Sequence, residues 1–286
     1  MKEILVISGK GGTGKTTIVA SLAYLLEGPL VLADADVEAS NLPLLLDSKT
    51  IDEESFRAGW EPKRDQEKCS SCGLCREKCR FGAIQEDLSI DLVSCEGCGV
   101  CAWFCPEGAI EMEEKEVGRV FLSSTRYGPL VHAYLYPGEE NSGKLVSFVK
   151  RRARQIAEGQ GYPLILVDGS PGVGCPVIAS LAGVDWVLIV TEPTISALHD
   201  LERLICLIKH FRLPGSLVLN KADLSWEVAQ RIITLAEREG FPLWGQLPYD
   251  KDVLEALHQG QPLPAVSKGP LVDGLAKIAW RLRENL

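Results

Sequence analysis

A glycine-rich segment near the amino terminus sets the strongest limit on how this chain can fold. Residues 8–17 read SGKGGTGKTT and match the pattern GxxxxGK[ST]. The segment follows an apolar run at residues 4–7 and precedes a helical pattern at residues 15–26. A strand, a glycine loop and a helix in this order aim backbone N–H groups and a helix N-terminus at a phosphate group. The pattern therefore predicts a phosphate-binding loop in an α/β domain.

The loop supplies both a cation and a metal ligand for a nucleoside triphosphate. Lys15 is expected to bridge the β- and γ-phosphates, and the Thr16 hydroxyl is expected to hold Mg²⁺. Lys10 is a second lysine in a loop that needs only one for phosphate binding. The residues predicted to contact the nucleotide are Gly9, Lys10, Gly11, Gly12, Thr13, Gly14, Lys15, Thr16 and Thr17.

Apolar runs alternate with helical patterns along most of the remaining chain. Continuous apolar strands between helices are typical of a parallel sheet covered on both faces. We predict a doubly wound α/β domain with strands at residues 4–7, 30–33, 117–122, 130–136, 164–167, 186–190 and 216–219, and with helices at 15–26, 144–158, 197–211, 226–239 and 269–286.

Two of these strands end in carboxylates that suit magnesium chemistry. Asp168 ends the run at 164–167 and precedes Gly-Ser-Pro-Gly, where a Walker-B aspartate and a mobile switch are expected. Asp36 follows the second strand, where it can orient the attacking water or reach Mg²⁺ through water. Asp34 has two open interpretations, a strand-end cap and a second functional carboxylate.

Three motifs together resemble the deviant Walker-A ATPases. They are KGGTGKTT at 10–17, DADVEASN at 34–41 and VDGSPG at 167–172. That group includes MinD-, ParA- and Mrp-type proteins and the nitrogenase iron protein, and the resemblance covers residues 1–46 and about 117–286. It implies that Lys10 reaches across a homodimer to stabilise phosphate charge on the partner's nucleotide. On this basis the predicted catalytic residues are Lys10, Lys15, Asp36 and Asp168.

The identity of the base is left open by two overlapping motifs. The resemblance places an adenine-contacting asparagine at Asn220 and a second purine-contacting loop at Pro248. Residues 220–223 also read Asn-Lys-Ala-Asp, the NKxD pattern of GTPases, in which Asp223 would accept hydrogen bonds from guanine. The resemblance favours ATP, and GTP is the alternative.

Cysteine, glycine and charged residues dominate residues 60–114, where regular apolar periodicity stops. The pattern C-x2-C-x2-C-x3-C occurs twice, and the second copy begins 26 residues after the first. In this spacing three thiolates of one loop grip a [4Fe–4S] cluster while the fourth reaches the other cluster. Zinc is the alternative, although it would leave cysteines unused. The two predicted ligand sets are Cys69, Cys72, Cys75 and Cys105, and Cys95, Cys98, Cys101 and Cys79.

The repeat resembles a bacterial two-cluster ferredoxin. Pro106 after Cys105 fits that pattern, whereas Arg80 stands at the equivalent place in the first copy. We therefore expect an inserted dicluster ferredoxin-like α+β module at 60–114, between the two parts of a P-loop ATPase domain at 1–59 and 115–286. Such an insertion costs little, because loop-closure entropy grows slowly with length.

Charge and hydropathy argue against two classes of partner. The formal net charge is −9, which disfavours nucleic acid and anionic membrane surfaces. The apolar runs are short, so membrane insertion is not expected, and no signal peptide is recognised. A cytoplasmic location follows as an expectation. Cysteines in that reducing compartment serve as metal ligands more often than as disulfides.

Several smaller features have a preferred interpretation. Cys206 is interpreted as a core residue. The resemblance to the nitrogenase iron protein implies that a cluster shared between subunits needs two cysteines per subunit, and Cys175 has no such second cysteine. The basic run at 150–154 is interpreted as a solvated face, with docking of an acidic redox partner as the alternative. The four histidines are interpreted as structural. The apolar stripe of the last helix is expected to pack in the core rather than on a membrane.

Three functions remain in competition. The preferred one is an ATPase that couples nucleotide-dependent dimerisation to electron transfer through two [4Fe–4S] clusters toward an unknown redox partner. The second is an ATP-dependent scaffold or carrier that passes a cluster to an acceptor protein. The third is a positioning ATPase whose clusters sense redox state. All-cysteine ligation suits permanent clusters and is the reason for the preference.

Overall fold

The computed structural model describes residues 1–139 and 142–285 and divides the chain into two compact units. Unit 1 comprises Met1–Glu54 and Arg119–Leu286, and unit 2 comprises Ser55–Gly118. Strands β3 (Lys49–Arg64) and β4 (Ile110–Thr125) contribute residues to both units.

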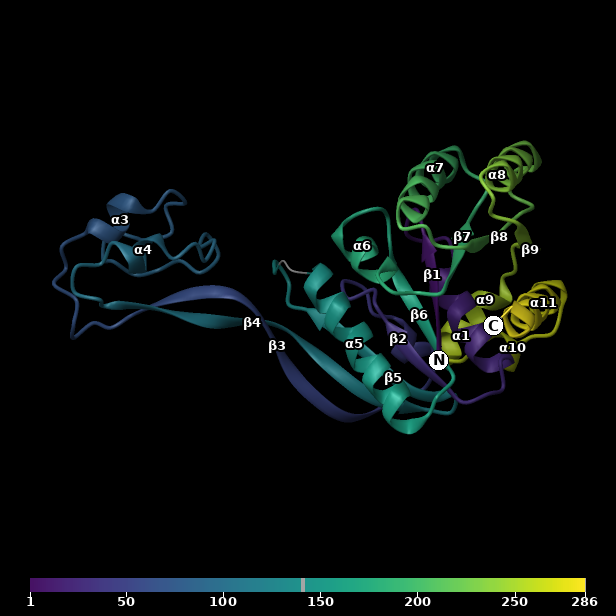
Figure 1. Ribbon diagram of the computed structural model, residues 1–286, viewed down its shortest axis with the longest axis horizontal. Coiled ribbons are helices and arrows are strands. Elements are labelled where there is room, and N and C mark those ends of the chain that lie inside the picture. The colour runs from purple at the N-terminus through teal and green to yellow at the C-terminus, as the bar shows by residue number, and fades with distance from the viewer. Residues whose placement is uncertain (140–141, 286) are drawn as a thin grey trace. The chain divides into compact units, whose positions relative to one another are not determined.

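The described residues form one nine-stranded sheet in the order β3-β4-β5-β2-β6-β1-β7-β8-β9 (Figure 1). Every strand pair from β5 across to β9 is parallel. The predicted parallel α/β fold is therefore confirmed. The remaining strands are β1 (Lys2–Ser8), β2 (Leu30–Asp34), β5 (Gly128–Leu135), β6 (Leu164–Pro171), β7 (Trp186–Thr191), β8 (Gly215–Leu219) and β9 (Leu243–Gln246).

Helices cover both faces of the parallel part of the sheet. Helices α1 (Lys15–Leu25) and α11 (Pro270–Asn285) pack on one face, and α5 (Ser142–Gln160) packs on the other (Figure 1). The other helices of unit 1 are α2 (Leu42–Leu45), α6 (Cys175–Leu181), α7 (Ile195–His210), α8 (Trp226–Arg238), α9 (Asp252–Gln259) and α10 (Leu263–Val266).

Strand β1 lies at the centre because its apolar residues are buried on both sides. Ile4 and Val6 pack in one core cluster with side chains of α1 and α11. Leu5 and Ile7 point the other way along the strand and are equally buried. The core packing expected for the last helix is confirmed, although Leu286 lies outside the described residues. Its apolar stripe is buried at Leu271, Leu275, Ile278, Ala279 and Leu282.

Two interpretations of single residues are wrong. Cys206 is exposed on α7 and is not a core residue. Lys150, in the basic run, is buried with its Nζ 3.0 Å from Glu3 Oε1, and it donates to the carbonyl oxygens of Ser180 and Ala182. This lysine therefore belongs neither to a solvated face nor to a docking patch. It joins α5 to β1 and to the end of α6.

Unit 2 repeats its backbone conformation as well as its cysteines. Its short helices α3 (Leu74–Lys78) and α4 (Val100–Trp103) occupy equivalent places in the two copies. Left-handed backbone then recurs at pairs of positions in the same register. These pairs are Ser71 and Gly97, Gly73 and Gly99, and Gly82 and Gly108. The sequence repeat thus folds twice into the same loop and helix.

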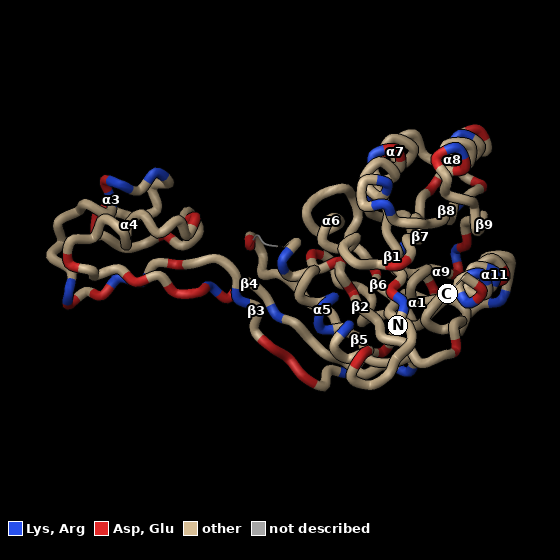
Figure 2. Tube along the Cα trace, viewed as in Figure 1, with Lys and Arg blue, Asp and Glu red and all other residues tan. Residues whose placement is uncertain are grey.

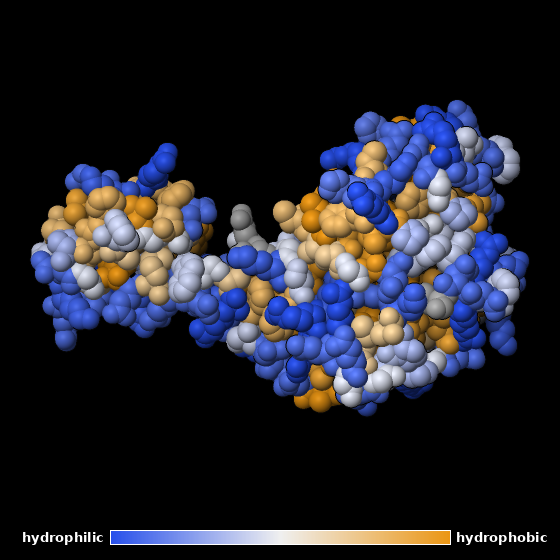
Figure 3. Space-filling view, viewed as in Figure 1, coloured by the Kyte–Doolittle hydropathy of each residue, from blue (hydrophilic) through white to orange (hydrophobic). Residues whose placement is uncertain are grey.

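Strands β3 and β4 carry many charged residues (Figure 2). Arg119 Nη1 lies 3.0 Å from Glu53 Oε1, and Lys63 Nζ lies 3.1 Å from Glu113 Oε1. Within unit 2, apolar side chains gather on the visible face of the space-filling view (Figure 3). Exposed large apolar residues of this unit include Trp60, Phe81, Val93 and Trp103. No helix in the described part of the chain has the length and apolar character needed to span a membrane.

Candidate functional site

A cavity of about 620 Å³ opens in unit 1 above the phosphate loop between β1 and α1. Gly12 and Gly14 in this loop have φ of 80° and 90°, which side-chain-bearing residues rarely adopt. Helix α1 begins at Lys15, so the unpaired N–H groups of its first turn face the cavity. Among the predicted contacts, the cavity is lined by Gly11, Gly12, Thr13, Gly14, Lys15, Thr16 and Thr17.

Asn220 holds this loop from the end of β8. Its Nδ2 donates to the Thr13 carbonyl oxygen at 2.8 Å, and the residue is only 9% exposed. A Cβ atom on Gly14 would lie 2.4 Å from the same Nδ2, so glycine is required there for space as well as for φ. Asn220 and Pro248 both line the cavity, where they were predicted to meet the base.

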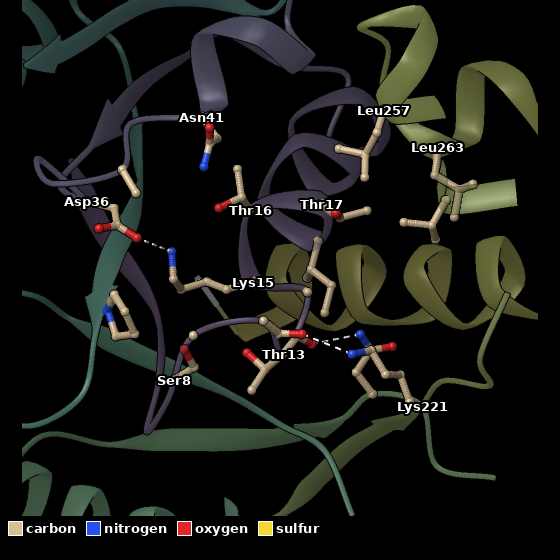
Figure 4. Close-up of a pocket in the computed structure, with 18 of the residues that line it drawn as sticks. Ser8, Thr13, Lys15, Thr16, Thr17, Asp36, Asn41, Lys221, Leu257 and Leu263 are labelled. Atoms are coloured by element: carbon tan, nitrogen blue, oxygen red, sulfur yellow. Dashed lines mark hydrogen bonds and ion pairs between the residues drawn. The ribbon is translucent and has the colours of Figure 1, made fainter. Parts of the chain in front are cut away.

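Lys15 lies between two carboxylates. Its Nζ is 2.6 Å from Asp168 Oδ1. The same Nζ is 3.6 Å from Asp36 Oδ2 (Figure 4). Burial alone would lower the pKa of Lys15, but Asp168 and Asp36 outweigh it and leave that pKa above its ordinary value. Burial raises the pKa of Asp36, and the nearby Lys15 partly offsets the effect. A bound triphosphate would take over the lysine that these carboxylates now hold.

Asp34 acts as a cap on the turn that follows β2. Its carboxylate accepts hydrogen bonds from Asp36 N at 3.0 Å, Ser40 Oγ at 2.8 Å and Leu42 N at 3.1 Å. Burial, together with the charge of Asp168, raises its pKa to about 7. These contacts favour the strand-end cap over a second functional carboxylate.

Two buried oxygens beside the loop lack a partner within the described part of the chain. They are Asp168 Oδ2 and Thr13 Oγ1. Such atoms are normally satisfied in a folded protein, so they fit a bound group at this place. Thr16 and Asp36 line the cavity on the same side as Asn41 (Figure 4). These oxygen donors suit Mg²⁺, which would neutralise phosphate charge when bound.

Lys10 does not line the cavity formed by the described residues, in contrast to Lys15. Its Nζ lies 2.8 Å from Glu192 Oε1 and donates to Thr194 Oγ1 at 3.1 Å and to Ser196 Oγ at 3.2 Å. Gly9, the other loop residue away from the cavity, faces α7, because a Cβ there would lie 2.7 Å from Asp200 Cβ. Sequence inspection missed Glu192, which follows the end of β7 without any motif.

The described lining of the cavity does not include Asp223, the carboxylate that the GTPase interpretation expects to contact guanine. Asp223 Oδ1 accepts from Tyr249 N at 2.7 Å. The NKxD interpretation thus lacks the carboxylate that it requires in the cavity. Lys221 lines the cavity, and its Nζ donates to the Gly12 carbonyl oxygen at 2.9 Å. Apolar side chains, including Leu257 and Leu263, form the wall beyond (Figure 4).

Unit 2 brings cysteines of both predicted sets together, and one apolar cluster includes Cys79 and Cys101 of the second set as well as three cysteines of the first. One small cavity is lined by all four cysteines of the second predicted set, Cys79, Cys95, Cys98 and Cys101. Three cysteines of the first set pack around a shared apolar cluster that contains Ile84 and Ile110; they are Cys69, Cys75 and Cys105. Cys72 and Cys98 are exposed at equivalent positions of the repeat.

The sulfur atoms of unit 2 have donors of the kind that thiolate ligands attract. Ala109 N donates to Cys105 Sγ at 3.3 Å, and Arg64 Nη1 lies 3.9 Å from Cys69 Sγ. Burial raises the pKa of the Cys75 and Cys101 thiols. In the described ranges, no group of three or more acidic, histidine or cysteine side chains is arranged so that it could hold a single metal ion. A four-iron cube differs, because it spreads its thiolates over separate iron atoms.

Comparison with known protein families shows which family the chain belongs to. The model of the CobQ/CobB/MinD/ParA nucleotide binding domain matches residues 4–263. The chain belongs to this family. With its phosphate loop in place, it is an ATP-hydrolysing P-loop enzyme of the MinD/ParA type. The family assignment predicted from the three sequence motifs is thereby confirmed.

Relatives of this family member extend over nearly all of its length. An uncharacterized protein of Methanocaldococcus jannaschii is 35% identical over 286 residues, covering 99% of this chain and 94% of the relative. A second uncharacterized protein of that organism is 28% identical over 270 residues, covering 91% and 92%. A chloroplastic septum site-determining minD homolog of Arabidopsis thaliana is 28% identical over 291 residues, covering 99% and 74%.

Solved structures share the fold. The septum site-determining protein MinD of Pyrococcus horikoshii, complexed with Mg-ADP, has a TM-score of 0.62 and 18% identity and covers 99% of this chain and 96% of its own. The cell division ATPase MinD of Pyrococcus furiosus has a TM-score of 0.61 and 18% identity, with coverage of 100% and 99%.

Proposed function

We propose that this chain is a nucleotide-dependent switch of the MinD/ParA type, which binds Mg-ATP, dimerises around it and hydrolyses it. The supporting observation is the contrast between the two loop lysines. Lys15 faces the cavity, whereas Lys10 points out of it toward Glu192. A lysine that does not line its own nucleotide cavity fits a role toward the nucleotide of a second subunit. The Mg-ADP complex of the Pyrococcus horikoshii relative supports the choice of nucleotide.

Molecular mass and turnover test this proposal together. With a non-hydrolysable ATP analogue and Mg²⁺, the wild-type chain should form a dimer in light scattering. Lys10→Ala should still bind the nucleotide but should lower kcat on the order of 10³-fold, as loss of a cationic finger does. Lys209→Ala, at an exposed lysine paired with Glu239, is the matched control and should leave both readouts unchanged. A monomer at saturating analogue, or full turnover by the Lys10 variant, would refute the proposal.

We further propose that residues 60–114 of unit 2 are an inserted dicluster ferredoxin-like module with two [4Fe–4S] clusters. The same left-handed backbone positions occur in both copies of the repeat, which supports two equivalent loops of cysteine ligands. The cavity lined by Cys79, Cys95, Cys98 and Cys101 supports the exchange of one cysteine between the loops. When bound, the clusters would supply one-electron redox chemistry.

Metal analysis of anaerobically purified protein tests the clusters. Two cubes correspond to about eight iron and eight sulfide per chain. Cys72→Ser and Cys98→Ser, at equivalent positions, should each lose about half of the iron. Cys206→Ser, on α7 in unit 1, is the control and should lose none. Stoichiometric zinc without sulfide would contradict the assignment.

The relatives favour one role among the three that the sequence left open. Relatives with a named role include septum site-determining proteins, which supports a positioning ATPase over an electron-transfer enzyme. We therefore infer that the ATPase acts in positioning and that the clusters report redox state to it. Sedimentation with anionic phospholipid vesicles, or with DNA, should depend on ATP. Absence of binding to either surface would leave electron transfer as the better account, because it needs no surface.

A further inference from the structure

Glu192 holds two lysines at once. Its Oε1 lies 2.8 Å from Lys10 Nζ, and its Oε2 lies 2.8 Å from Lys221 Nζ. The residue is only 8% exposed, so its carboxylate has lost most of its water. Burial would raise its pKa, but the hydrogen bonds from Lys10 and Lys221 outweigh this and hold the pKa below its ordinary value. Each oxygen of the carboxylate therefore serves one ammonium group.

Without Glu192, the surroundings of the Lys10 ammonium group would be unfavourable for a positive charge. Thr194 is the N-cap of α7, and its Oγ1 accepts from Ala197 N as well as from Lys10. The N-terminus of a helix carries partial positive charge and disfavours a nearby ammonium group. The carboxylate of Glu192 offsets that repulsion. Thr194 Oγ1 and Ser196 Oγ also accept from Lys10, but Glu192 supplies the negative charge that holds this ammonium group beside α7.

Lys221 keeps Glu192 paired when Lys10 leaves. Its Nζ touches both Glu192 and the Gly12 carbonyl oxygen of the phosphate loop. A buried carboxylate stripped of every cation would be strongly destabilising. With Lys221 in place, the departure of Lys10 still leaves one carboxylate facing one ammonium group. The arrangement can therefore release Lys10 at limited cost.

We propose that Glu192 is a positioning residue that holds Lys10 within its own subunit until a partner's nucleotide takes it, with Lys221 as the counter-cation that permits the release. This rests on the proposed function, in which Lys10 acts across a dimer. Glu192 and the partner's phosphate then compete for the same ammonium group. Weakening the Glu192 contact favours the dimer, and removing Lys221 favours the single subunit.

Sedimentation at saturating non-hydrolysable ATP analogue and Mg²⁺ tests the competition, because it measures the protein concentration at half-dimerisation. Glu192→Gln should lower that concentration by at least about threefold, and Lys221→Met should raise it by a similar factor. Glu239→Gln is the matched control, because Glu239 also accepts from two cations, Lys209 and Arg238, but lies outside the cavity. It should behave as the wild type does.

A second comparison separates release of Lys10 from general loosening of the fold. In a Lys10→Ala background, Glu192→Gln should have no further effect on dimerisation, since the two changes act on one contact. Thermal unfolding of Glu192→Gln and of the charge-retaining Glu192→Asp identifies a folding defect. If Glu192→Gln fails to fold, Glu192→Asp, whose shorter side chain cannot span both lysines, should still show the lowered concentration.

The outcomes distinguish the two proposals. A wild-type chain that stays monomeric with analogue would overturn the proposed function and this proposal with it. A wild-type chain that dimerises, combined with folded Glu192 variants that dimerise equally or more weakly, would overturn this proposal alone. An undiminished effect of Glu192→Gln in the Lys10→Ala background would also overturn it.

Discussion

His132 shows how one side chain can make the stability of the molecule depend on pH. It lies half-buried on β5, with Nε2 3.0 Å from Ser123 Oγ and its ring stacked on Phe121 at a centroid distance of 5.0 Å. Burial lowers the pKa of His132 to about 4. An unfolded chain would take up a proton near pH 6.5, whereas the folded chain resists it. Folding stability is therefore lost as the pH falls through this window.

We predict that His132→Gln removes part of this pH dependence. Between pH 7 and pH 5 the free energy of unfolding of the wild type should fall by about 1–2 kcal/mol more than that of the variant. Urea unfolding followed by circular dichroism at the two pH values measures the difference. His258→Gln, at an exposed histidine on α9, should keep the wild-type dependence. Identical losses in wild type and His132→Gln would contradict the prediction.

Residue types at the site were predictable from the sequence, but their partners were not. The glycine pattern identified Lys15 and Thr16 because spacing alone fixes a phosphate loop. The partners of Lys10 and Lys150 are Glu192 and Glu3, far away in the chain. No local pattern links such residues, and only the order of strands in the sheet brings them together. For this reason a buried lysine was interpreted as a surface charge.

At the scale of elements, the long and periodic segments were predictable and the exposed ones were not. Helices α7 and α8 and strands β6 and β7 follow apolar patterns and lie close to their predicted bounds. Strand β3 was missed, because most of its residues are exposed and no apolar alternation marks it. The short helices α6, α9 and α10 were also missed, since few residues carry their signal.

The two copies of the internal repeat allow equivalent positions to be compared within one chain. Gly97 and Ser71 occupy equivalent positions and have φ of 62° and 56°. A Cβ on Gly97 would lie 2.2 Å from the carbonyl oxygen of Trp60 in β3, so this copy has no room for a side chain. Ser71 shows that the first copy accommodates one. The two loops share a conformation but differ in how β3 packs against them.

We predict that Gly97→Ser and Ser71→Gly have unequal effects. Gly97→Ser should destabilise unit 2 by about 2 kcal/mol or more, because backbone strain adds to the contact with Trp60. Ser71→Gly should change stability by less than about 1 kcal/mol. Iron retained per chain after mild urea treatment measures both. Equal retention by the two variants would show that β3 does not restrict the second loop.

The whole molecule combines an ATPase with a unit that is separable in sequence. Unit 2 is inserted between residues 54 and 119 of unit 1. Glu53 and Arg119 form an ion pair beside the two points where the chain leaves unit 1 and returns to it. A short hairpin turn could therefore join residues 54 and 119 without disturbing the sheet. Such a deletion variant should keep Mg-ATP binding, because every described residue of the cavity belongs to unit 1. It provides the control for any communication between the proposed clusters and the nucleotide.

Thermodynamic linkage decides whether the proposed clusters and the nucleotide site act on each other. If ATP binding changes the reduction potential of a cluster, reduction must change ATP affinity by the same factor. For a one-electron couple, a tenfold change in affinity corresponds to about 59 mV. Both the redox-sensing and the electron-transfer roles require such a shift, whereas a permanent structural cluster does not. We expect it to be measurable and to be the same from either direction.

Potentiometric titration with and without ATP analogue, and ATP binding to oxidised and reduced protein, test this linkage. The deletion variant should bind ATP equally under oxidising and reducing conditions, which excludes a direct effect of the reductant on unit 1.

The redox-sensing and electron-transfer roles predict different outcomes. Redox sensing predicts that cluster oxidation state changes ATP-dependent binding to a surface. Electron transfer predicts faster delivery of electrons to an acceptor during ATP turnover. Potentials and affinities that are independent of each other would make the clusters structural and reject both roles.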